Sequence, residues 1–111
     1  MYKEYHKLVR DGIPDIIRRK GKHCEVAVMN EEEYRQALRE KLVEEAKEAA
    51  QAQALQELIT ELAEVQEVLD ALRATYTLPY ETIVQEQARR RAERGGFQQR
   101  LRLLWTMGSQ G

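Results

Sequence analysis

The feature that most constrains the fold of this chain is a long stretch that almost lacks helix-breaking residues. Between Gly21 and Gly95 the sequence contains no glycine and a single proline, Pro79. Glycine and proline are the residues that most disfavour a helix interior, so this stretch leaves room for long helices. Charged residues make up 33% of the 111-residue chain, above the usual level of about 25%, and many of the others are Ala and Leu. We therefore expect a mainly α domain.

Three long helices follow from local signals within this stretch. Asn30 is a favourable N-cap and is followed by acidic residues, which suit the positive end of a helix. We expect that helix to continue to about Gln53, and a second one to cover about Leu55–Thr75. Pro79 suits the first turn of a third helix because its φ angle is fixed, and the glycine pair at 95–96 ends that helix.

Shorter elements are expected toward the two ends of the chain. Pro14 opens a short helix over Asp15–Lys20, which Gly21 stops. Partly alternating, β-branched or apolar runs predict short strands over Tyr5–Arg10, Cys24–Met29 and Phe97–Trp105. The whole pattern predicts a single domain over residues 1–105, a helical bundle with short β-strands near the N- and C-termini, and a flexible tail over residues 106–111.

The first long helix places a carboxylate where its pattern calls for an apolar side chain. At about 100° per residue, its apolar face is formed by Tyr34, Leu38, Leu42 and Ala49. Glu45 falls in the middle of that face, and Glu48 lies one turn further on at its edge. An unpaired carboxylate in a core position is unfavourable by several kcal/mol, or shifts its pKa. Glu45 and Glu48 therefore call for a specific explanation.

The second long helix carries a similar pair. Its apolar face is formed by Leu55, Leu58, Leu62, Val65, Leu69 and Leu72. Glu61 lies at the border of this face, and Glu64 follows three residues later on the same side. A short connection near Gln53 favours antiparallel packing of the two helices. Glu61 and Glu64 can then approach the pair on the first helix, and a divalent cation would relieve the repulsion. Oxygen ligands suit Mg²⁺ or Mn²⁺.

The same carboxylates also allow a simpler interpretation. Glu44 with Glu48, and Lys41 with Glu45, have the spacing of ordinary neighbours on a helix surface, where most Glu residues are solvated. Glu67-x-x-Asp70 forms a competing carboxylate pair on the second helix. Glu67 lies opposite the apolar face, which makes this pair a weaker candidate for a metal site.

Three ordered motifs resemble one enzyme superfamily. The spacing Glu45-x-x-Glu48 followed by Glu61-x-x-Glu64 resembles the Glu-x-x-Glu…Glu-x-x-Asp signature of the MazG-like, all-α nucleoside triphosphate pyrophosphohydrolases. Residues 7–14, Lys-Leu-Val-Arg-Asp-Gly-Ile-Pro, resemble the opening of the phosphoribosyl-ATP pyrophosphohydrolase-like subgroup, and residues 93–97, Glu-Arg-Gly-Gly-Phe, resemble its ending. The resemblance spans nearly the whole chain. The sequence departs from the family pattern at Glu64, where the family usually has Asp. Asp70 is therefore a further candidate ligand of the metal.

The resemblance implies a Mg²⁺-dependent hydrolysis of a nucleoside triphosphate to a monophosphate and pyrophosphate, as in the removal of non-standard nucleotides. Water would attack the α-phosphorus, and pyrophosphate would leave. The resemblance further implies a homodimer or homotetramer. The residues implied are Glu45, Glu48, Glu61 and Glu64 as metal ligands, Glu44 or Glu45 as the base, and Lys7, Arg10 and Arg94 as phosphate-binding residues.

Two alternatives belong to other functional classes. A catalytically inactive helical interaction module of the same fold would show the same apolar pattern. A nucleic-acid binder would use the basic residues between Arg89 and Arg102. The net charge of −1 provides no overall attraction for nucleic acid or membranes, so binding of nucleic acid is not expected.

Cysteine content and hydropathy bear on location. Cys24 is the one cysteine of the chain, which excludes an internal disulfide and fits a reducing cytoplasm. No apolar run approaches the roughly 20 residues that span a membrane, and residues 1–10 are too polar for a signal peptide. We expect a cytoplasmic protein.

Overall fold

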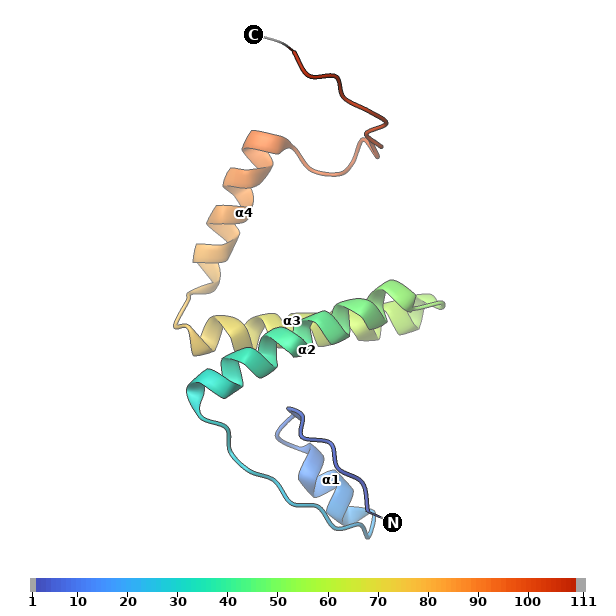
Figure 1. Cartoon of the computed structure of the whole chain (residues 1–111), viewed down its shortest axis with the longest axis vertical. Coiled ribbons are helices and arrows are strands. Elements are labelled where there is room, and N and C mark those ends of the chain that lie inside the picture. Colours follow the sequence, from blue (N-terminus) through green and yellow to red (C-terminus); the bar gives the residue numbers. More distant parts are fainter. Residues whose placement is uncertain (1, 110–111) are drawn as a thin grey trace. The chain divides into compact units, whose positions relative to one another are not determined.

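The computed structural model describes residues 2–109, and the regular structure within them is entirely helical (Figure 1). The helices are α1 (Ile13–Arg19), α2 (Glu31–Gln51), α3 (Leu55–Thr75) and α4 (Tyr80–Arg94). The mainly α prediction is confirmed, and the long helices begin and end within about two residues of their expected bounds. None of the helices in this part of the chain is long and apolar enough to cross a membrane.

The predicted strands are wrong: Tyr5–Arg10, Cys24–Met29 and Phe97–Trp105 contain no strand. A strand is stable only when its backbone pairs with another strand, and none of these segments finds such a partner among residues 2–109. Two of them are also bent. His6 has a φ of 48° and Arg100 a φ of 58°, values in the left-handed region that interrupt an extended run.

The chain divides into two compact units, one ending at Leu78 and the other beginning at Pro79. The first unit contains α1, α2 and α3, and the second contains α4 and the segment after it. The single domain over residues 1–105 and the flexible tail over 106–111 stay predictions, and residues 110–111 of that tail lie outside the described residues.

A capping box fixes the start of α2. The Asn30 side chain accepts a hydrogen bond from the backbone N–H of Glu33 at 2.8 Å, and the Glu33 carboxylate accepts one from the backbone N–H of Asn30 at 3.2 Å. These bonds satisfy two of the backbone donors that a helix start leaves free. The predicted N-cap is therefore confirmed.

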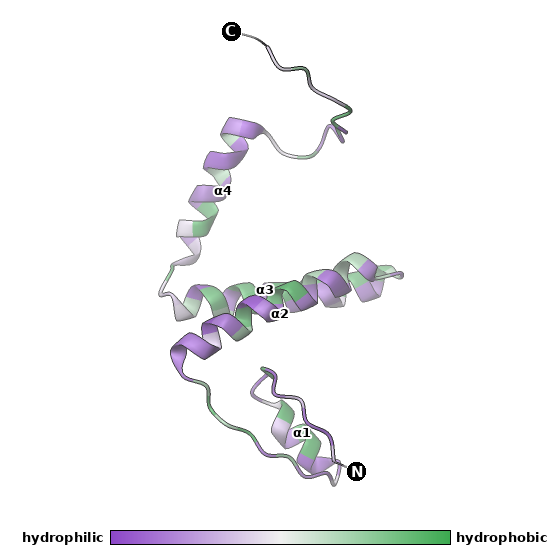
Figure 2. Ribbon diagram, in the orientation of Figure 1, coloured by the Kyte–Doolittle hydropathy of each residue, from purple (hydrophilic) through white to green (hydrophobic). Residues whose placement is uncertain are grey.

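Helices α2 and α3 form an antiparallel hairpin, joined by residues 52–54 and packed along their length (Figures 1 and 2). Leu38 of α2 and Val68 of α3 are buried in it, with 3% and 7% of their surface exposed. Other apolar residues of the hairpin are much more open: Ile59 and Leu62 remain 50% and 51% exposed. The hairpin core is small, so this pair of helices leaves apolar surface uncovered.

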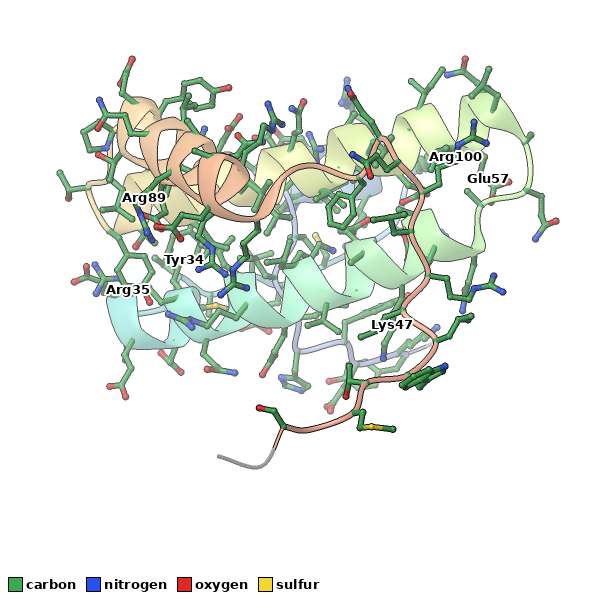
Figure 3. All side chains as sticks on the ribbon, turned by 90° about the horizontal axis from the view of Figure 1, so that it is seen from above. Tyr34, Arg35, Lys47, Glu57, Arg89 and Arg100 are labelled. Carbon is green, nitrogen blue, oxygen red and sulfur yellow. The ribbon has the colours of Figure 1, made fainter. Side chains whose placement is uncertain are left out.

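Arg35, near the beginning of α2, forms hydrogen bonds with the end of α3 (Figure 3). Its guanidinium donates to the Thr75 side chain at 3.3 Å and to the Thr75 backbone carbonyl at 2.5 Å, and it lies 4.1 Å from the centre of the Tyr76 ring. Arg39 donates to the Tyr76 hydroxyl at 2.8 Å. A cation suits a helix C-terminus, where carbonyls lack partners. These contacts fix the register in which α2 and α3 face each other.

Candidate metal centre

Three glutamates from the two helices converge in the half of the hairpin nearer the connection at residues 52–54. Glu45 and Glu48 of α2 and Glu61 of α3 each offer one carboxylate oxygen, and these oxygens all lie within 4.8 Å of one another. Glu45 is only 5% exposed, Glu61 is partly buried and Glu48 is exposed. The helical pattern placed Glu45 on the apolar face of α2, and its burial confirms that prediction. We call this group the carboxylate cluster.

The environment of the carboxylate cluster disfavours its full negative charge. Burial raises the pKa of Glu45, and the nearby Glu48 carboxylate adds to the rise. Lys41 acts in the opposite direction, because its Nζ lies 3.6 Å from a Glu45 oxygen. The pKa of Glu61 is also raised, first by burial and then by its hydrogen bond and charge interaction with Glu48. Carboxylates packed this closely need a proton or a cation between them.

One oxygen of the cluster has no partner. Glu61 Oε2 is buried and accepts no hydrogen bond from the part of the chain that the structure describes. An unsatisfied buried acceptor destabilises a fold, and a cation in contact with it would remove that penalty. The cluster offers oxygen donors alone, the set that Mg²⁺ and Mn²⁺ prefer. The residues present therefore fit a hard divalent cation.

The other predicted ligands lie outside this group. Glu64 Oε2 accepts a hydrogen bond from Arg10 Nη2 at 2.9 Å instead of joining the carboxylate cluster. Asp70 forms an exposed ion pair with Arg73 one turn later on α3, so it does not join either. Metal binding by Glu64 stays a prediction, and the cluster itself contains three of the four expected ligands.

The predicted base and phosphate-binding residues fall into two groups. Glu44 lies beside the carboxylate cluster, with its Oε1 at 3.4 Å from Lys7 Nζ and 3.9 Å from Lys41 Nζ. Lys7 and Arg10 therefore both lie next to residues of the predicted site. Arg94 is exposed at the end of α4, in the unit that begins at Pro79, and its phosphate contact stays a prediction.

Lys41 is the residue whose place at the site the sequence did not reveal. Its spacing from Glu45 indicated an ordinary surface pair on one helix, yet its ammonium lies between Glu44 and Glu45. The burial of Glu45 is the signal that could have identified it, since a lysine four residues before a core carboxylate reaches that carboxylate. Lys41 also borders an open groove of about 440 Å³ between the N-terminal segment and α2, lined by residues that include His6, Lys7, Gln36 and Glu44.

The raised pKa values of Glu45 and Glu61 predict how the stability of the metal-free protein depends on pH. In the folded chain both carboxyls hold a proton more tightly than at their ordinary pKa of 4.5. As the pH rises above that value, the folded chain binds more protons than the unfolded chain, so the free energy of unfolding decreases. Between about pH 5 and pH 7 we expect the melting temperature to fall, and to fall less in Glu45→Gln. Thermal melts in chelator, followed by circular dichroism, measure this; equal pH profiles for the two proteins would contradict it.

Comparison of the chain with protein-family models, with curated proteins and with solved structures finds no match in any of the three.

Proposed function

We propose that this protein is a Mg²⁺-dependent nucleoside triphosphate pyrophosphohydrolase of the MazG-like type, which releases pyrophosphate and a nucleoside monophosphate. The observation that carries the proposal is the carboxylate cluster of Glu45, Glu48 and Glu61, with oxygens within 4.8 Å and one buried oxygen unsatisfied. The motifs at residues 7–14 and 93–97, and the spacing of the glutamates, support the reaction class through their resemblance to this superfamily.

The cluster residues would hold the metal. Glu45 comes from the buried face of α2, and Glu61 faces it from α3, so the site is fixed by the packing of two helices rather than by a loop. When bound, Mg²⁺ would neutralise the negative charge of the phosphate oxygens in the transition state. Glu48 is exposed and would form the side of the site that is open to solvent.

Glu44 is the better placed of the two candidate bases. Glu45 is buried and belongs to the cluster, whereas Glu44 is half-exposed beside it and is oriented by Lys7 and Lys41. In the proposed reaction Glu44 accepts a proton from water as the oxygen of that water bonds to the α-phosphorus. The bond from this phosphorus to the bridging oxygen breaks, and pyrophosphate leaves with the electron pair.

Two cations, Lys7 and Lys41, line a groove that could take a nucleotide. Lys7 and Arg10 make half-exposed ion pairs with Glu44 and Glu64, and such pairs are weak enough for a polyphosphate to compete for the cations. The groove of about 440 Å³ beside Lys41 and Glu44 has the size of a small-molecule site. Arg94 is proposed as a further phosphate-binding residue on the strength of the resemblance alone.

A nucleotide panel tests the proposed activity. With Mg²⁺ present, we expect pyrophosphate release from at least one nucleoside triphosphate, and we expect a chelator to abolish it because the cluster then has no cation to offer. The measurement is pyrophosphate and monophosphate appearing in equal amounts. No hydrolysis of any standard or modified nucleotide would favour a catalytically inactive interaction module instead.

We further propose a homodimer or homotetramer. Ile59 and Leu62 of the hairpin are half-exposed, and Val43 of α2 is 55% exposed. A contiguous exposed apolar patch on a protein marks a surface that binds another molecule. Sedimentation in the ultracentrifuge is expected to show more than one copy per particle. Leu62→Asp should shift the particle toward the monomer, because a buried interface disfavours an unpaired charge. A wild-type protein that sediments as a monomer at all concentrations would contradict this.

A further inference from the structure

The segment before α1 is tied to both helices of the hairpin. We call residues 5–12 the N-terminal strap. Its Lys7 Nζ lies 3.4 Å from Glu44 Oε1 of α2, and its Arg10 Nη2 lies 2.9 Å from Glu64 Oε2 of α3. Lys7 and Arg10 are three residues apart, so these two ion pairs hold the strap across α2 and α3 beside the carboxylate cluster.

Glu64 is the carboxylate with two possible partners. It follows Glu61 by one turn on the same side of α3, a spacing that places the Cβ atoms of two helix residues about 5–6 Å apart. Its carboxylate nevertheless lies with Arg10 and not with the cluster. A Glu side chain has three rotatable bonds, so Glu64 can turn from one partner to the other without any movement of α3.

Charge and coordination favour such an exchange once a cation is bound. Mg²⁺ takes about six oxygen ligands in an octahedron, and the three cluster carboxylates leave positions for others. The ion pair of Arg10 and Glu64 is open to water, with 51% and 35% of the side chains exposed. Exposed pairs of this kind contribute little to stability, and a doubly charged ion attracts the Glu64 carboxylate more strongly than a guanidinium does at equal distance.

We propose that Arg10 is a positioning residue, which holds Glu64 away from the carboxylate cluster and releases it when the divalent cation binds. The inference rests on the metal site of the proposed function. The exchange leaves Arg10 without its carboxylate partner beside the metal centre, where it is available to a phosphate. It also removes one of the two ion pairs that tie the N-terminal strap to the hairpin.

The affinity of the full chain for Mn²⁺ alone tests the exchange, with free Mn²⁺ measured by its electron paramagnetic resonance signal. Arg10→Gln should bind Mn²⁺ about 3-fold to 5-fold more tightly, because Glu64 no longer has to leave a partner. Glu64→Gln should bind it more weakly. In the double variant, Arg10→Gln should have no further effect, since its effect acts through Glu64.

Two controls separate this from a general charge effect. Lys7→Gln removes the same charge from the N-terminal strap, but its partner Glu44 is not a proposed ligand, so the expected change in Mn²⁺ affinity is smaller. Arg10→Lys keeps the charge and should remain near wild type. An equal tightening by Arg10→Gln with and without Glu64, or by Lys7→Gln as much as by Arg10→Gln, would overturn the proposal.

The role of Arg10 and the proposed metal site can fail separately. If Glu45→Gln and Glu61→Gln weaken Mn²⁺ binding while Arg10→Gln has no effect, only the role of Arg10 is wrong. If the wild type binds no Mn²⁺, both proposals are wrong.

Discussion

Glu45→Gln is expected to lower the rate of pyrophosphate release by more than about 100-fold. Loss of a residue that merely supports a metal ligand typically reduces affinity or activity by about 10-fold to 100-fold, and Glu45 is proposed as a ligand itself. The amide keeps the shape of the side chain but removes one of the three carboxylates of the carboxylate cluster. Pyrophosphate release at saturating Mg²⁺, under conditions where the wild type is active, measures the effect.

The same variant should not lose stability when metal is absent. Burial and the Glu48 charge raise the pKa of Glu45, so the folded protein gains from a neutral group at this position near pH 7. Glu67→Gln is the matched control, because Glu67 is an exposed glutamate of α3 outside the cluster, and it should remain fully active. Wild-type activity in Glu45→Gln would show that the site has been assigned to the wrong residues.

Mg²⁺ is expected to raise the melting temperature of the protein by about 10 °C at 100 times its dissociation constant. A ligand that binds only the folded chain adds about 2.7 kcal/mol to the free energy of unfolding at that concentration, and each kcal/mol corresponds to about 4 °C or more for a domain of this size. The gain arises because the cation relieves the repulsion of Glu45, Glu48 and Glu61 and satisfies the buried Glu61 oxygen.

Glu61→Gln should lose most of this shift, and Glu67→Gln should keep it. The comparison is made by calorimetry after removal of bound metal with a chelator, followed by titration with MgCl₂. A shift of equal size in Glu61→Gln would mean that Mg²⁺ acts elsewhere on the chain, and no shift in the wild type would count against a metal site in the cluster.

The sequence was most informative where structure depends on neighbouring residues. The N-cap at Asn30 determines where α2 begins, and the near absence of glycine and proline allows α2 and α3 to be long, because capping and helix propensity act within a few residues. The burial of Glu45 could be predicted for the same reason: a regular period of 3.6 residues determines which side chains share a face. The pattern alone could not distinguish a metal ligand from a solvated glutamate at Glu48, an edge position.

The predictions that were wrong or stayed open concerned features that depend on a segment far away in the sequence. The apolar run at Cys24–Met29 has the composition of a strand, but no other segment of residues 2–109 pairs with it. The composition of a segment indicates how well its residues fit a strand, but it does not indicate whether a second strand is close enough to pair with it. The position of Glu64 depends on Arg10, which is 54 residues away in the chain, and no local pattern contains that contact.

The sequence by itself therefore determined the helices, the apolar face of each and the anomaly of a glutamate in the middle of one of them, since all of these follow from helix geometry. Only the tertiary structure decided which carboxylates meet. The antiparallel packing of α2 and α3, fixed in register by Arg35, brings Glu61 to Glu45 and Glu48. The N-terminal strap meanwhile gives Glu64 a different partner. Those choices depend on the distances between segments far apart in the chain, and such distances exist only after the helices have packed.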